Sequence, residues 1–132
     1  MTEDSEAESA RPYAVRLSPQ ANRDVAEALL YPDSATESED LAKRWLDGLY
    51  VEFSRLATRP KRCLVSERES KLFRRETRRT IYRRVPGSVA YLILFFITDS
   101  GEDGPIVKIV HVRHGGRKPM TRAEARQILA GQ

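Results

Sequence analysis

The chain has 132 residues, of which 40% are hydrophobic, and this is enough for one domain with a single core but too little for two. It is basic, with a net charge of +4. Its single cysteine, Cys63, excludes an intrachain disulfide and favours a reducing cytoplasm, and its apolar run Val89–Ile97 is too short to span a membrane.

The N-terminal residues 1–11 are polar and acidic, and we expect them to form a disordered tail. They lack the apolar core of a signal peptide. The first ten residues carry four carboxylates and no basic side chain, so the rest of the chain has a net charge of +8. We expect one domain over residues 12–120, followed by a helical extension over residues 121–132.

The first half of the domain predicts one strand and two helices. Residues 13–17 alternate large apolar side chains with small or charged ones, which is typical of a half-buried strand. Ser18-Pro19 is a helix start, with a capping residue before proline at the first helical position. Thr36 and Glu39 form a capping-box pattern, and apolar residues then recur at helical spacing to about Ala57. Two consecutive amphipathic helices predict an antiparallel hairpin that covers a sheet face.

The second half predicts a three-stranded antiparallel meander. Residues 60–70 are expected to be a loop, and a turn is expected at Pro86-Gly87. The middle strand is apolar on both faces, so it should be central and covered on both sides. The predicted strands are Phe73–Val85, Val89–Thr98 and Ile106–Arg113. Thr121 and Glu124 form a capping box that opens a short C-terminal helix. The predicted fold class is α+β: strand, helical hairpin, meander and C-terminal helix.

Positive charge is concentrated before and within the first strand of the meander. Residues 55–84 hold twelve lysines and arginines but only three carboxylates. A basic sheet of this kind indicates a polyanion or an acidic protein as the binding partner.

Several short motifs, in order, resemble the RelE/ParE superfamily of bacterial type II toxins, also called plasmid stabilisation proteins. They include Leu17-Ser-Pro-Gln-Ala21, Arg79-x-x-Tyr82 and the closing Val110-His-Val-Arg-His-Gly115-x-Arg117. The resemblance covers roughly residues 13–119. It implies a toxin that is neutralised by a cognate antitoxin, whose acidic C-terminal segment wraps around the toxin.

Two modes of action are implied within this superfamily: inhibition of DNA gyrase, and cleavage of messenger RNA on the ribosome. The resemblance places tentative catalytic positions at Arg83, Arg84, Arg113, Arg117 and Tyr91. Positions expected to bind the target or a nucleic acid are Arg79, Tyr82, His114 and Lys118.

Two departures from the ribonuclease pattern favour gyrase or another central target. Leu92 stands where ribonuclease members carry arginine, and no tyrosine follows Arg117. A ribosome-dependent endoribonuclease and a non-catalytic basic binding module remain the alternatives. No cofactor is expected. His111 and His114 have no ligand-like partner nearby in the sequence, so no metal site is predicted.

Overall fold

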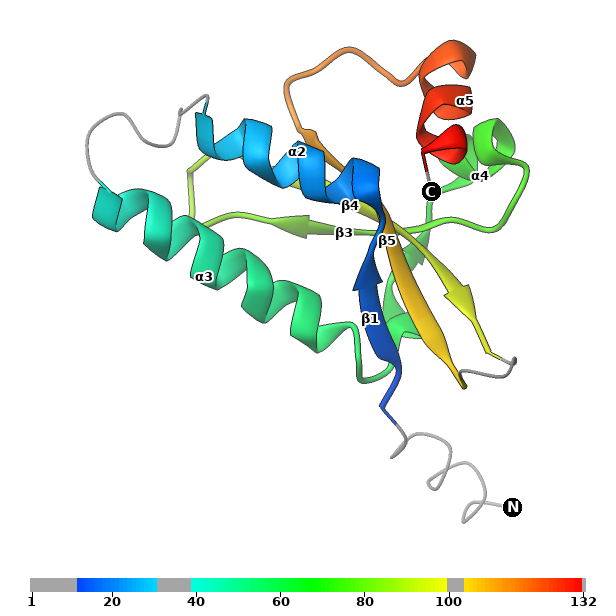
Figure 1. Cartoon of the computed structure of the whole chain (residues 1–132), viewed down its shortest axis with the longest axis horizontal. Coiled ribbons are helices and arrows are strands. Elements are labelled where there is room, and N and C mark those ends of the chain that lie inside the picture. Colours follow the sequence, from blue (N-terminus) through cyan, green and yellow to red (C-terminus); the bar gives the residue numbers. More distant parts are fainter. Residues whose placement is uncertain (1–11, 31–38, 100–103, 132) are drawn as a thin grey trace.

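The computed structural model describes residues 12–30, 39–99 and 104–131. Its α+β fold is shown in Figure 1. The elements in chain order are β1 (Ala14–Leu17), α2 (Pro19–Leu30), α3 (Glu39–Arg55), a 3-10 turn η1 (Pro60–Arg62), β2 (Leu64–Val65), α4 (Glu67–Phe73), β3 (Arg78–Tyr82), β4 (Tyr91–Thr98), β5 (Ile106–His114) and α5 (Arg122–Ala130).

The strands form one mixed sheet in the order β1-β5-β4-β3-β2. Strands β3, β4 and β5 are consecutive and antiparallel. The sheet is larger than the predicted meander, because β1 pairs in parallel with β5 and β2 pairs antiparallel with β3. The first and last predicted strands therefore become neighbours, although Ala14 and its register partner Ile106 are more than ninety positions apart in the sequence.

Strand β4 is central and covered on both faces, as its continuous apolar sequence predicts. One face carries Ile93 and Phe95, which pack with apolar residues of α2 and α3 such as Val25 and Phe53. The opposite face carries Leu94 and Phe96, which belong to a second cluster with residues of α4 and α5: Phe73, Ala125 and Ile128. Figure 1 shows α4 and α5 lying together, apart from the α2 and α3 pair.

Three local signals in the sequence are confirmed. The hydroxyl of Ser18 accepts a hydrogen bond from the Ala21 amide at 3.0 Å, which caps α2. The predicted turn forms with Gly87 at a φ of +86°. Thr121 and Glu124 make the complete capping box of α5. The other predicted capping box includes Thr36, which lies outside the described residues.

The prediction of a loop over residues 60–70 is wrong, because this segment contains η1, β2 and the start of α4. The predicted strand Phe73–Val85 is also too long. Phe73 ends α4 and packs edge-on against Phe96 at 5.6 Å between ring centroids, and Arg74 then takes a left-handed conformation that terminates the helix. Only Arg78–Tyr82 remains extended as β3.

Tyr82 of β3 contacts helix α3 directly. The Tyr82 hydroxyl donates a hydrogen bond of 2.8 Å to the Trp45 carbonyl, and burial raises the pKa of this phenol. A Cβ atom at Gly48 would stand only 2.3 Å from the same hydroxyl. Glycine is therefore needed at this position for space, despite its low helix propensity.

Candidate functional site: a basic cleft on one sheet face

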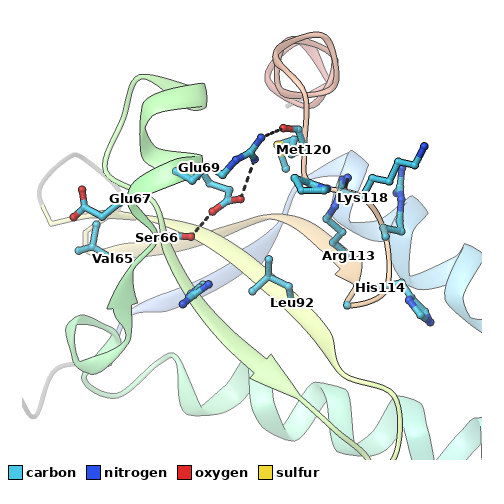
Figure 2. Close-up of a pocket in the computed structure, with 14 residues that line it drawn as sticks. Val65, Ser66, Glu67, Glu69, Leu92, Arg113, His114, Lys118 and Met120 are labelled. Atoms are coloured by element: carbon cyan, nitrogen blue, oxygen red, sulfur yellow. Dashed lines mark hydrogen bonds and ion pairs between the residues drawn. The ribbon is translucent and has the colours of Figure 1, made fainter.

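A cavity of about 490 Å³ opens on the sheet face that carries α4 and α5. We call it the basic cleft. One wall is formed by residues 65–69 at the start of α4, and the other by residues 113–120, which lead from β5 to α5. Leu92 of β4 lies on the floor between these walls (Figure 2). The charged side chains that line it are Glu67, Arg68, Glu69, Arg79, Arg113, Arg117 and Lys118.

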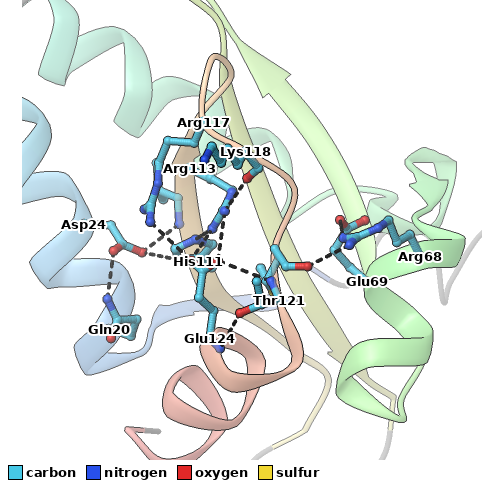
Figure 3. A network of polar contacts seen from close by, with 12 residues as sticks. Gln20, Asp24, Arg68, Glu69, His111, Arg113, Arg117, Lys118, Thr121 and Glu124 are labelled. Atoms are coloured by element: carbon cyan, nitrogen blue, oxygen red, sulfur yellow. Dashed lines mark hydrogen bonds and ion pairs between the residues drawn. The ribbon is translucent and has the colours of Figure 1, made fainter.

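Arg113 is the structural centre of the β5–α5 connection. It is only 6% exposed and donates two hydrogen bonds to the Glu124 carboxylate, at 2.9 and 3.3 Å. It also donates to the Lys118 carbonyl at 2.6 Å. These bonds hold the Glu124 pKa below its ordinary value, with the Arg113 hydrogen bond as the main cause. A predicted catalytic arginine thus joins α5 and the cleft wall to the sheet (Figure 3).

A buried polar chain continues from Arg113 to α2. Nε2 of His111 faces Arg113 Nη1 at 3.3 Å and accepts from it, so the proton of the neutral ring is on Nδ1, which donates to Asp24 at 2.7 Å. The same carboxylate accepts from the Val112 amide at 2.9 Å and from Gln20 at 2.8 Å. Figure 3 shows this chain running from α2 to α5. Strand β1 ends opposite Ile109, so within the described residues the Val112 amide further along β5 has no strand partner on that side. Asp24 accepts the hydrogen bond from this amide instead.

The loop after β5 is held close to β4. The Gly115 amide donates to the Ala90 carbonyl at 2.8 Å, and a Cβ atom at Gly115 would stand 2.8 Å from that oxygen. Nδ1 of His114 accepts from the Gly116 amide at 2.9 Å. The His114 ring also lies edge-on to Tyr91 at 5.4 Å. The His114 ring therefore has a fixed orientation on the Tyr91 side of the sheet, where it lines a second cavity of about 180 Å³ with Tyr91 and Arg117.

The cations at the cleft mouth are more accessible than Arg113. The Arg117 side chain is 53% exposed and contacts Glu124 at 3.2 Å. Arg79 and Lys118 are also exposed. On the α4 wall, Arg68 donates to the Met120 carbonyl at 2.8 Å, which fastens the two walls to each other. Arg79, Arg113, His114, Arg117 and Lys118 are thus brought together by the fold.

The other predicted site residues lie elsewhere. Arg83 and Arg84 follow the end of β3, are exposed, and do not line the cleft; Arg83 donates to the Ser88 carbonyl at 2.7 Å. Tyr82 and Tyr91 are each 5% exposed and pack edge-on against Trp45 of α3. Their rings belong to the core on the sheet face opposite to Leu92 and Leu94.

Sequence reasoning missed the partners that organise the cleft: Asp24, Arg68 and the second role of Glu124. Only α4 had a readable local signal, since Ser66 followed by Glu69 three residues later is a capping-box pattern. Ser66 is the N-cap of α4, and its hydroxyl bonds to the Glu69 carboxylate. The Asp24–His111 contact joins residues 87 positions apart and left no pattern in the sequence.

A mixed sheet covered by two helix pairs, with a basic cleft built from its last strand, defines a small domain whose exposed chemistry is cationic. The comparison with protein families makes the class specific. The family described as the ParE toxin of the type II toxin-antitoxin system, parDE, matches residues 15–119. The chain belongs to this family, which confirms the predicted RelE/ParE relationship. No curated protein and no solved structure matches the chain significantly.

Two further observations concern the described residues as a whole. No helix within residues 12–30, 39–99 and 104–131 is long and apolar enough to cross a membrane. In the same ranges, no group of three or more histidine, cysteine and carboxylate side chains is arranged to hold a metal ion.

Proposed function

We propose that this toxin arrests bacterial growth by binding a central protein target in the cytoplasm, with DNA gyrase as the first candidate, and that a cognate antitoxin neutralises it through an acidic segment. The family supplies the toxin class. The step to a mechanism of binding rests on the composition of the basic cleft.

The observation that carries this proposal is the separation of phenols from cations. Metal-free RNA cleavage requires a base and an acid within hydrogen-bond reach of the phosphate that the cations hold. Tyr82 and Tyr91 are each 5% exposed and pack against Trp45 of α3, whereas Arg79 and Lys118 line the cleft on the other face. Arg117 lines the cleft and also a smaller cavity beside Tyr91. His111 is buried between Asp24 and Arg113. These contacts favour binding over chemistry.

Ribosome-dependent RNA cleavage is the second candidate, and His114 is the observation that favours it. The His114 imidazole lies edge-on to Tyr91 and lines a cavity of about 180 Å³ with Tyr91 and Arg117, so a ring that can donate or accept a proton lies beside a phenol and a cation. A non-catalytic basic module, the third candidate, is favoured by the apolar side chain of Leu92 on the floor.

Inducible expression of the full chain in a bacterium tests the proposal. We expect growth arrest, relief on co-expression of the neighbouring gene product, and loss of gyrase supercoiling in extracts that contain the toxin. Truncated message in a translating extract, with supercoiling intact, would assign the function to the ribosome instead. Normal growth at a high soluble yield would contradict both.

Two variants connect the arrest to the predicted site residues. Arg83→Ala and Arg117→Ala change exposed side chains, so the fold should be retained. We expect each to weaken growth arrest at an unchanged circular dichroism spectrum. Full toxicity in both variants would remove these arginines from the functional surface.

A further inference from the structure

An apolar strip extends the cleft floor onto the open part of the sheet. Ile81 of β3 lies opposite Leu92 of β4, and Leu92 lies opposite Arg113 of β5, so these three side chains point to the same face. Helices α4 and α5 cover Leu94, the next residue of β4 on this face, which is fully buried. They leave Ile81 54% exposed. Ile81 and Leu92 thus form a solvent-facing apolar strip beside the cleft.

Cations surround this strip. Arg79 precedes Ile81 by two residues on β3 and faces the same side, while Arg117 and Lys118 stand on the opposite wall of the cleft. Within the described ranges, the Arg79 guanidinium has no hydrogen bond or ion pair with the protein, so it is available to a ligand. Arg83 is exposed just beyond the end of β3.

A nucleic acid strand fits this surface poorly. Proteins that hold single strands stack the bases on aromatic side chains, but the one aromatic residue among the described residues that line the cleft, His114, packs its ring against Tyr91 instead. An acidic polypeptide with an aliphatic side chain matches both the cationic rim and the apolar strip.

We infer that the sheet face formed by Ile81, Leu92, Arg79 and Arg117 docks an acidic segment of the toxin's target protein, with an aliphatic side chain of that segment seated on Ile81 and Leu92. The inference rests on the proposed function and deepens it, since it assigns a surface and a partner chemistry. We assign the occupant to the target because the strip is continuous with the cleft that holds the predicted target-binding residues Arg79, His114 and Lys118.

Two variants at equally exposed positions test whether this sheet face, rather than any exposed apolar residue, is needed for growth arrest. Ile81 on the sheet and Val51 on α3 are both 54% exposed, so aspartate at either position removes a similar apolar area. We expect Ile81→Asp to abolish growth arrest while co-purification with the antitoxin persists. Val51→Asp should arrest growth like the wild type. Ile81→Thr keeps a β-branched side chain and replaces the aspartate variant if that variant does not fold.

Defined probes test the partner chemistry directly. Two labelled short peptides, each rich in glutamate with either leucine or alanine at the centre, and a single-stranded oligonucleotide of equal charge are titrated into the full chain by fluorescence anisotropy. We expect the leucine peptide to bind ~tenfold more tightly than the alanine peptide, because it buries an aliphatic side chain. This advantage should disappear in Ile81→Asp and persist in Val51→Asp.

Each contrary result has a separate meaning. Equal affinities for the two peptides, or tighter binding of the oligonucleotide, would overturn the docking inference. Growth arrest by Ile81→Asp with loss of antitoxin binding would also overturn it, because the face would then belong to the antitoxin. A wild-type chain that does not arrest growth contradicts the proposed function, whereas the peptide comparison is decided independently of toxicity.

Discussion

Replacing Glu124 by glutamine tests how the C-terminal helix is joined to the sheet. The glutamate accepts two hydrogen bonds from Arg113 and one from Arg117, and glutamine keeps its shape but removes its charge. Breaking a fully buried ion pair at one partner costs about 3–5 kcal/mol. Arg113 is 7% exposed at its side chain but Glu124 is 29% exposed, so water replaces part of the lost contact. We expect a loss of roughly 2 kcal/mol in the free energy of unfolding at neutral pH.

Thermal unfolding followed by circular dichroism measures this loss as a fall of about 6–8 °C in Tm. Asp99→Asn is the matched control, because it makes the same chemical change in an exposed pair. Asp99 bonds to Lys61 at 2.9 Å, with both side chains more than half exposed. Such pairs contribute about 0–1 kcal/mol. Equal destabilisation by Glu124→Gln and Asp99→Asn would refute a structural role for the Arg113–Glu124 pair.

The pH dependence of the Glu124 effect has a defined sign. Hydrogen bonding to Arg113 lowers the Glu124 pKa in the folded protein, so the carboxylate contributes its full stabilisation above the unfolded pKa. That contribution is lost as the pH falls through the lower folded pKa. The difference in Tm between wild type and Glu124→Gln should therefore shrink below about pH 4.5. A difference that stays constant down to pH 3 would show that charge is not its origin.

Three further variants test the packing and polar contacts. Gly48→Ala should destabilise the fold by about 2 kcal/mol despite the better helix propensity of alanine, because its Cβ meets the Tyr82 hydroxyl. Tyr82→Phe should restore part of the loss, and a stabilised Gly48→Ala would contradict this packing. Asp24→Asn should cost about 2 kcal/mol in urea unfolding, because the charged acceptor of His111 is lost, and a change below 0.5 kcal/mol would count against the buried chain. Arg113→Ala should lower stability by about 3 kcal/mol, whereas Arg117→Ala should change it by less than about 1 kcal/mol, and the reverse order would exchange the roles given to these arginines.

Capping residues, turn residues and apolar runs in the sequence predicted most of the helices and strands. Ser18-Pro19 and the Thr121 capping box placed two helix starts, and the apolar run of β4 identified the central strand. The prediction for the segment before β3 was wrong for a physical reason. Its arginines carry no periodicity, so β-favouring residues such as Thr77 indicated a strand, and the capping pattern at Ser66 was missed. The helix α4 is seven residues long, and packing of Phe73 on Phe96 supports it more than intrinsic propensity does.

The long-range contacts that build the cleft could not be predicted from the sequence, for a different reason. The sequence predicted that β1 and β5 are extended and that a helix follows β1. It did not predict that β1 pairs in parallel with β5, because tertiary packing sets that pairing and the position of the helix. Asp24 meets His111 only because α2 crosses the edge of β5 where β1 ends. Strand alternation explains why two neighbouring side chains of one predicted motif take different roles: Arg113 belongs to the buried polar chain beside the cleft, whereas the His114 ring packs against Tyr91.

Strand alternation gives the candidate site its composition. Adjacent residues of a strand point to opposite faces, so Tyr91 and Leu92 are separated by the sheet, as are Tyr82 and Ile81. The resemblance to the toxin superfamily grouped the tyrosines with the arginines without regard to which face of the sheet each side chain occupies. Sorting by parity instead puts the tyrosines under α3 and the aliphatic side chains beside the cations. An aliphatic floor with a cationic rim is a surface suited to an acidic protein segment, and this composition follows from one register between β3 and β4.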